Sequence, residues 1–416
     1  MNKEILRLAI PNIISNISVP VLSAVDVALM GHLASTQELG AIAVGATIFN
    51  VLYWGFGFLR MSTTGMTAQV SGAKKQSQSI AMLEMASKVA LVSGFLLILL
   101  QPVISVVSFR LIEASNEVEY LTKQYFGIRI LAAPATLMLY CFHGWFLGMQ
   151  NARIPMFLVI ITNLSNIILN LVLVMGLEMK VDGVALGTVI SQYIGLIMAV
   201  VLFWYHYRHL WQYRSSHRVL WRRFFFISGD IVIRTLSLVL CHAFFTSKSA
   251  SLGDQILAVN TLLLQFISLL AFAVDGFAFA AECLIGKYKG QANQSQLNRA
   301  IHYTFLWGYA FGLFFSFAFW LIGTKILYLF TDQPNLIQQA NHYFIWVIIA
   351  PILNVSAYVW DGIYLGASAS QPMRNAMVFS AVVIFFPTYY LLIRFGNHGL
   401  WTALMLFTLS RGLTLT

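Results

Sequence analysis

Long apolar runs recur along the whole chain and constrain its fold more than any other feature. Each is about as long as the ~20 residues that a helix needs to cross a bilayer, or longer. The twelve runs cover residues 8–33, 40–71, 80–108, 122–148, 155–177, 183–207, 224–248, 255–286, 300–329, 337–366, 375–394 and 398–415. Because a spanning helix satisfies all of its backbone polar groups internally, runs of this length favour helices. The sequence therefore predicts an all-α polytopic membrane protein with twelve transmembrane helices.

The low content of charged residues agrees with a membrane protein and changes how the positive net charge is interpreted. Only 10% of the residues are charged, against about 25% in soluble proteins. A net charge of +10 in a soluble chain would suggest nucleic-acid binding. Here most Lys and Arg residues lie in short links between apolar runs, so we expect membrane lipids and no nucleic acid as partners. We also expect a monomer.

The distribution of Lys and Arg predicts the orientation of the chain in the membrane. Alternate links are basic, whereas the links between them carry mostly Glu and Asp. Since cytoplasmic loops are enriched in Lys and Arg, the basic links and both termini are predicted to be cytoplasmic. The longest basic stretch, 208–223, is interpreted as a cytoplasmic linker between a six-helix N-terminal lobe, 1–207, and a six-helix C-terminal lobe, 224–416.

The two halves of the chain repeat short pairs of residues in the same order and at a nearly constant offset. The repeated pairs are Tyr125-Phe126 with Tyr343-Phe344, Leu147-Gly148 with Leu365-Gly366, and Pro155-Met156 with Pro372-Met373. An even number of spans in each half makes the two repeats parallel. Such a pseudo-symmetric duplication is typical of a transporter that works by alternating access.

The first apolar run contains an ionisable residue and two prolines. Asp26 lies well inside the run, where a carboxylate costs ~2.5–3.5 kcal/mol, so it is a functional-site hypothesis. Pro11 and Pro20 each remove a helical hydrogen bond. We therefore expect a bendable first helix that carries a titratable group. The alternative is a kinked structural helix whose Asp26 is hydrogen-bonded to a neighbour.

Several motifs resemble the DinF branch of the MATE (multidrug and toxic compound extrusion) family. They are Gly31-His-Leu, Phe58-Leu-Arg-Met-Ser-Thr-Thr-Gly-Met-Thr-Ala-Gln69, Ala273-Val-Asp-Gly-Phe-Ala278 and Asn397-His-Gly-Leu-Trp401. The resemblance implies two six-helix lobes, a bacterial inner membrane and antiport of amphipathic or cationic compounds. It also implies the proton as the coupling ion, with sodium the less favoured choice. Asp26 matches the proton-coupling position and Pro11 the bending proline.

A polar stripe follows the fifth apolar run. Asn163, Asn166 and Asn170 are spaced so that they share one helical face, and such a face is expected to point into the bundle. The resemblance groups Asn166, Asn170 and Thr188 with the first-helix acid in an N-lobe pocket. This sequence differs from the family pattern at Asn170, where relatives commonly carry aspartate. The alternative role is interhelical hydrogen bonding, worth ~0.6 kcal/mol per bond.

A set of charged residues in the apolar runs forms a second candidate site, in the C-lobe or at the lobe interface. Asp230 and Arg234 have the i, i+4 spacing of a pair on one helix face, and Asp275 and Glu282 share another face. Buried charges are almost always paired, so a structural ion-pair network is as reasonable as transport chemistry. The full set is Arg60, Asp230, Arg234, Asp275, Glu282 and Asp361.

Motifs for other chemistries are absent from the sequence. It contains neither a Walker A motif nor a zinc-binding or nucleophile-elbow motif, and its three cysteines are scattered through apolar runs. We therefore expect no enzyme activity, no cofactor and no metal. Two alternatives remain open at this point, a flippase or exporter for a lipid-linked substrate and a membrane-bound acyl or prenyl transferase.

Overall fold

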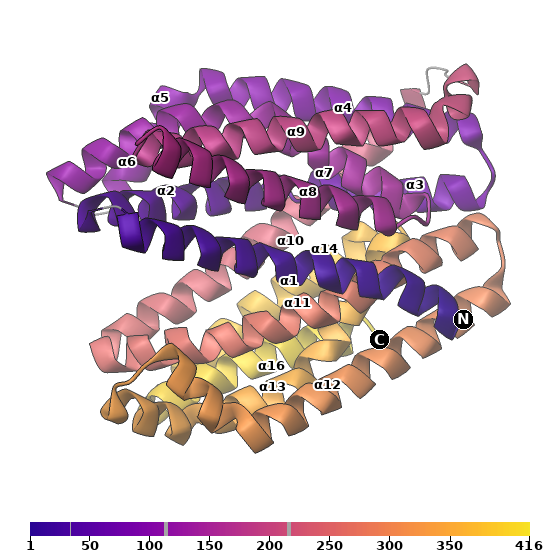
Figure 1. The fold of residues 1–416 in the computed structure, drawn as a ribbon. Helices are drawn as coiled ribbons and strands as arrows, with labels where there is room; N and C mark the ends of the chain where they lie inside the picture. Colours follow the sequence, from indigo (N-terminus) through magenta and orange to yellow (C-terminus); the bar gives the residue numbers. More distant parts are fainter. Residues whose placement is uncertain (34, 112–114, 214–217) are drawn as a thin grey trace. The chain divides into compact units, whose positions relative to one another are not determined.

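The fold is all-α, as the sequence predicts. The computed structural model describes the backbone of residues 1–33, 35–111, 115–213 and 218–416, and in these ranges the side chains of all residues except 21, 23–33, 111, 218–220 and 329. Every described regular element is helical (Figure 1). Within the described part of the chain, nine helical stretches are long and apolar enough to cross a membrane. The other three predicted spans coincide with α1, with α14 to α15 and with α16.

The helices follow the predicted runs, with several breaks inside them. In chain order they are α1 (Asn2–Leu33), α2 (Thr36–Trp54), α3 (Phe58–Gly72), α4 (Gln76–Leu99), α5 (Gln101–Leu111), α6 (Asn116–Arg129), α7 (Ala133–Gly148), α8 (Arg153–Asn170), α9 (Val181–Tyr207), α10 (Arg218–Ser251), α11 (Asp254–Gly290), α12 (Gln294–Phe330), α13 (Pro334–Gly366), α14 (Ser370–Phe379), α15 (Phe386–Leu391) and α16 (Asn397–Thr414). The predicted run 40–71 is divided between α2 and α3, because the chain turns between Gly55 and Gly57.

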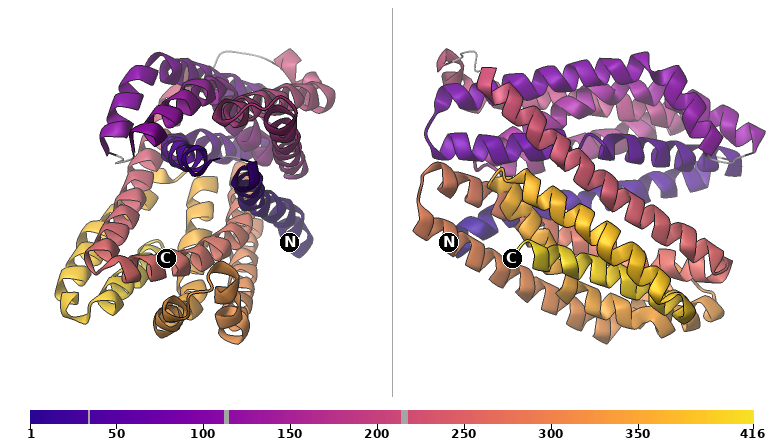
Figure 2. Two further views of the ribbon diagram at one scale, coloured as in Figure 1. Left: turned by 60° about the vertical axis from the view of Figure 1, so that its left-hand side comes forward. Right: turned by 180° about the vertical axis from the view of Figure 1, so that it is seen from behind.

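The chain forms two compact units, each with its own core. One consists of Met1–Ile13 with Phe225–Thr416, and the other of Ile14–Phe224. The sequence prediction placed residues 1–13 with the N-terminal lobe. In the structure they pack on α11, where Gly276 leaves room for the side chain of Ile13 and the backbone of Ala9. Within each unit the helices lie alongside one another (Figure 2).

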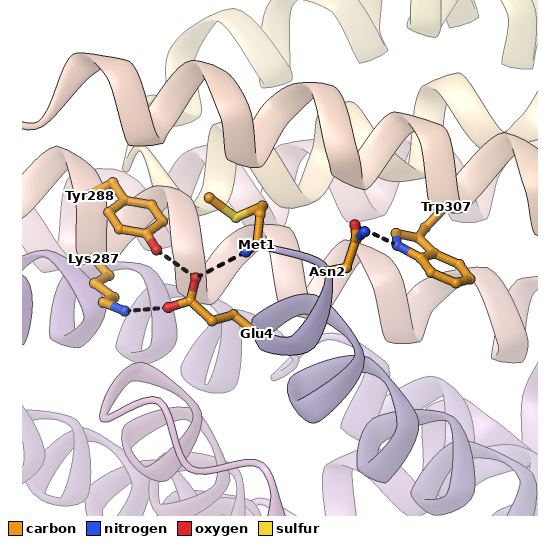
Figure 3. Close-up of polar contacts among 6 residues, drawn as sticks. All are labelled: Met1, Asn2, Glu4, Lys287, Tyr288 and Trp307. Atoms are coloured by element: carbon orange, nitrogen blue, oxygen red, sulfur yellow. Dashed lines mark hydrogen bonds and ion pairs between the residues drawn. The ribbon is translucent and has the colours of Figure 1, made fainter.

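Polar contacts hold the first turns of α1 in the unit formed with Phe225–Thr416. The carboxylate of Glu4 accepts hydrogen bonds from Lys287 Nζ at 3.0 Å and from the Tyr288 hydroxyl at 2.9 Å (Figure 3). Asn2 Oδ1 accepts a hydrogen bond from Trp307 Nε1 at 3.3 Å. The helix therefore begins at a fixed place on α11 and α12, and it continues without a break through Pro11 and Pro20.

Glycines repeated between the two halves make equivalent helix contacts in the two units. A β-carbon at Gly148 of α7 would lie 2.9 Å from the carbonyl oxygen of Thr64 on α3. At the repeat-equivalent Gly366 of α13, a β-carbon would overlap the carbonyl oxygen of Glu282 on α11. Small residues at such positions let helix backbones approach closely in membranes. The same packing solution therefore occurs once in each unit.

Candidate functional site

A pocket of about 250 Å³ lies inside the unit Ile14–Phe224. Side chains of α1, α2, α6, α8 and α9 line it. Its polar wall contains amide, hydroxyl and guanidinium groups, and its apolar wall comes mainly from α1 and α2. The polar lining residues are Asn50, Tyr125, Arg129, Thr162, Asn163, Asn166, Thr188, Ser191 and Gln192. The described lining residues include no Asp or Glu.

The predicted asparagine stripe of α8 is joined to α9 by hydrogen bonds. Asn170 Nδ2 donates to Asn166 Oδ1 at 3.2 Å, and Asn166 Nδ2 donates to Thr188 Oγ1 at 3.3 Å. Asn166 and Thr188 line the pocket, whereas Asn170 is fully buried behind them. Gly187 of α9 leaves the space that the Asn170 side chain occupies. The structure thus brings three of the predicted pocket residues together in one chain of contacts.

The fourth predicted pocket residue, Asn163, connects α8 to α1. Its Nδ2 donates to the hydroxyl of Ser18 at 3.2 Å, two residues before Pro20. Val19 and Leu22 of α1 also line the pocket. Asp26 belongs to α1 by its backbone, but its side chain lies outside the described residues, so its predicted proton-coupling role stays a prediction.

A second polar centre lies in the unit that contains α10 to α16. Asp361 of α13 is 6% exposed and pairs with two guanidinium groups. Its Oδ2 accepts hydrogen bonds from Arg234 of α10 and, at 2.6 Å, from Arg411 of α16. Both arginines are buried. One carboxylate therefore holds three helices of this unit together.

The i, i+4 pairing that the spacing of Asp230 and Arg234 suggested is wrong. Asp230 is 2% exposed and accepts hydrogen bonds from Arg374 Nη1 at 2.7 Å and from the Ser370 hydroxyl at 2.6 Å. Arg234 pairs with Asp361 on a different helix. Tertiary partners on α13 and α14 replace the local pairing, and each gives a buried charge a complementary group.

The remaining predicted charges lie on two helices. Arg60 is on α3, and Asp275 and Glu282 are on α11, with Glu282 fully buried. Arg60 and Asp275 belong to different units, and their place in one charge network stays a prediction.

Sequence reasoning missed three arginines of these centres, namely Arg129, Arg374 and Arg411. Arg129 and Arg411 stand inside predicted apolar runs, so the criterion that selected Asp26 also applies to them. Arg374 lies in the link between the predicted runs 337–366 and 375–394, and its charge indicates only a basic cytoplasmic link. For Arg129 and Arg411, the signal that identifies them is the free-energy cost of placing a cation in hydrocarbon.

The family model MatE matches residues 11–172 and 231–391 of the chain. These two segments correspond to the two halves that the sequence repeats predict. DNA damage-inducible protein F of Escherichia coli (strain K12) is 38% identical over 418 residues, covering 100% of this chain and 91% of the relative. The probable multidrug resistance protein NorM of Thermotoga maritima is 22% identical over 352 residues, covering 81% of this chain and 74% of the relative.

The fold is also that of solved transporters. An outward-facing multidrug resistance MATE family transporter of the MOP superfamily aligns with a TM-score of 0.90, at 18% identity, over 99% of this chain and 93% of the other. The predicted resemblance to the MATE family and its DinF branch is confirmed. Because the relatives are transporters, the acyl or prenyl transferase alternative is wrong. The chain is a multi-pass membrane protein of the MatE family of multidrug efflux transporters.

Proposed function

We propose that the protein exports amphipathic or cationic organic compounds by proton antiport and alternating access. The observation that supports this most is the polar pocket in the unit Ile14–Phe224, bounded on one side by α1. Small organic substrates are what transporters of this family handle. A pocket with an apolar wall and a few placed polar groups suits such ligands.

Asp26 is the proposed proton carrier. In the sequence, Asp26 follows Val19 by seven residues and Leu22 by four, which is the spacing of one helical face, and Val19 and Leu22 line the pocket. A charged carboxylate there attracts a cationic compound, and a neutral one does not. Proton and compound thus compete for one site or for one conformation, so each drives release of the other.

The charge pairing in the other unit favours the proton over sodium as the coupling ion. Sodium prefers oxygen ligands, and Asp361 is the buried carboxylate of the tenth predicted span. Its oxygen already accepts hydrogen bonds from two guanidinium groups. The same contact pairs the charge of Arg234 with Asp361. A flippase for a lipid-linked substrate would need basic residues to bind a pyrophosphate group, so this pairing weakens that alternative. The proposed coupling includes no cofactor and no metal.

The proposed setting is the bacterial inner membrane. The basic links favour cytoplasmic termini, and lipids surround a monomer. Proteoliposomes offer the direct test, with proton and sodium gradients imposed separately and efflux of a cationic dye measured. We expect a proton gradient alone to drive efflux. Efflux that requires sodium and ignores the proton gradient would overturn the proposed coupling.

The variant Asp26→Asn tests the proposed carrier. It should abolish proton-driven efflux without loss of folding, because removing a carboxylate from hydrocarbon does not destabilise the helix. Asp254→Asn, at the exposed start of α11, is the matched control and should pump as the unmodified protein does. An Asp26→Asn protein that pumps at the unmodified rate would remove Asp26 from the mechanism.

A further inference from the structure

Arg129 places a permanent positive charge in the wall of the pocket. It is the last residue of α6 and lines the pocket together with Tyr125. Its Nη1 donates a hydrogen bond to the Tyr125 hydroxyl at 2.5 Å. Its guanidinium carbon lies 4.8 Å from the centre of the Phe49 ring, close enough for a cation–π contact. The guanidinium is therefore held by a hydrogen bond at Nη1 and by ring contact on one of its faces.

The Nε atom of this guanidinium still lacks a hydrogen-bond partner among the described residues. Arg129 Nε is buried and has no hydrogen-bond partner in the described structure. The Tyr125 contact occupies only Nη1. The edge formed by Nε and a terminal nitrogen is the one that binds carboxylates through two parallel hydrogen bonds. A buried donor without a partner is costly, and an acceptor brought by a ligand would remove that cost.

The chemistry of the other lining residues restricts the kind of acceptor. The described lining residues carry no carboxylate, so none of them neutralises Arg129. Asn50 and Gln192 add amide groups to the lining, and these can also donate hydrogen bonds to a ligand. The volume of about 250 Å³ is below the ~300–1,000 Å³ of sites that enclose a drug-sized molecule. The pocket therefore fits a head group rather than a whole amphipathic compound.

We propose that Arg129 determines substrate specificity by binding the carboxylate of zwitterionic amphipathic compounds. This rests on the proposed export function, in which the charge of Asp26 attracts the cationic part of the same molecule. Arg129 Nε and a neighbouring guanidinium nitrogen donate to the two carboxylate oxygens. Phe49 and Tyr125 keep the guanidinium plane in place. Compounds that carry both charges are thus preferred to cations of the same skeleton.

A pair of dyes that differ only in this group tests the proposal. A rhodamine with a free carboxylate is zwitterionic, and its ethyl ester is a cation. Binding of both to the purified protein in detergent is measured by fluorescence anisotropy, and efflux of both from proteoliposomes under a proton gradient. Arg129→Gln should weaken binding of the free acid by about tenfold or more, as loss of a hydrogen bond to a charged group does. It should change binding of the ester by less than about twofold.

Two further variants keep the test informative if Arg129→Gln folds poorly. Arg129→Lys keeps the charge but loses the two-point geometry, so it should retain an intermediate preference for the acid. Lys123→Gln on the same helix removes an exposed cation that pairs with Glu119 outside the pocket, and it should alter neither dye. Equal weakening of both dyes, or none, in the Arg129 variants would overturn the proposal.

Failure of the inference and failure of the proposed function give different results. If the acid binds in an Arg129-dependent way but neither dye moves under a proton gradient, the export function is wrong and the specificity assignment stands. If both dyes are exported and neither binding nor efflux depends on Arg129, the specificity assignment is wrong and the export function stands.

Discussion

Asp361 is the residue on which two buried arginines of the unit that contains α10 to α16 depend. Its carboxylate accepts hydrogen bonds from Arg234 and Arg411, and all three side chains are buried. Desolvating a guanidinium is expensive, and a paired carboxylate offsets that cost only while it keeps its charge. The three helices that carry these residues are therefore stabilised by one anionic group.

Replacing Asp361 with Asn should strongly destabilise this unit. The change keeps the shape of the side chain but leaves two buried cations without this counter-charge, at a cost of ~3–5 kcal/mol. The thermal unfolding midpoint in detergent, read from α13 and α16 by hydrogen exchange, is the measurement. Lys123→Ala, which breaks an exposed pair with Glu119 at 2.6 Å, should cost at most about 1 kcal/mol. Equal midpoints for the two variants would contradict the assigned role of Asp361.

The sequence identified which residues carry buried charge better than it identified their partners. Asp361, Asp230 and Arg234 stand out because ionisable groups are rare in apolar runs. Their partners, such as Arg374 and Arg411, are far away along the chain. The i, i+4 rule concerns one helix surface and says nothing about tertiary neighbours. In the pocket, the same rule succeeded for the asparagines of α8, because their grouping depends only on helical periodicity.

At the scale of elements, α1 is anchored by its first turn. The Glu4 carboxylate, 2.9 Å from the Tyr288 hydroxyl, also pairs with Lys287 Nζ at 3.0 Å. Partial burial raises the pKa of Glu4, but the hydrogen bonds from Lys287 and Tyr288 and the charge of Lys287 outweigh it. The net result is a pKa below the ordinary value of 4.5. The anchor is therefore a charge-assisted contact outside the apolar run.

The anchor should weaken as the pH falls. Because the pKa of Glu4 is lower in the folded protein, its contribution is fully present above the unfolded value of about 4.5 and is lost as the pH falls through the folded value. Glu4→Gln should therefore melt below the unmodified protein at neutral pH, and the two curves should converge in acid. Tyr288→Phe, which removes one hydrogen bond, should give a smaller difference in the same pH window. A Glu4→Gln difference that is independent of pH would contradict this account.

The positions of the helices were predictable, but the breaks within them were not. Length and hydropathy suffice for a spanning helix, so each predicted run is helical in the structure. The turn between α2 and α3 and the π-helical stretches Leu171–Gly176 and Ser380–Phe385 interrupt runs that look continuous in the sequence. Such breaks depend on packing against neighbouring helices, which one segment does not encode.

At the scale of the whole molecule, the sequence repeats have a structural counterpart in helix packing. Gly94 of α4 lies against Pro134 of α7, and Gly312 of α12 lies against Pro351 of α13. These contacts sit at equivalent positions of the two repeats. A β-carbon at Gly94 or at Gly312 would lie within 3.0 Å of backbone atoms of the facing proline. The two repeats therefore share both the close contact between two helices and the glycine that allows it.

Because each unit has its own core, a packing defect should loosen the unit that contains it. Gly366→Ala forces a β-carbon onto the carbonyl oxygen of Glu282, and overpacking of this kind costs ~1–3 kcal/mol. Hydrogen exchange should then speed up in α11 and α13 and stay unchanged in α3 and α7. Gly148→Ala should give the reciprocal pattern, because its β-carbon would meet Thr64 and Thr67 of α3.

The matched control for both substitutions is Gly229→Ala. No atom lies within 4 Å of a β-carbon at Gly229, in the interior of α10, so alanine there should be neutral or stabilise by up to about 1 kcal/mol. Faster exchange after Gly229→Ala would mean that the glycine effect is not one of packing. Equal loss of protection in both units after either Gly366→Ala or Gly148→Ala would mean that the chain unfolds as one cooperative body. Confinement of each defect to its own unit would instead show that the duplicated halves remain separate folding units.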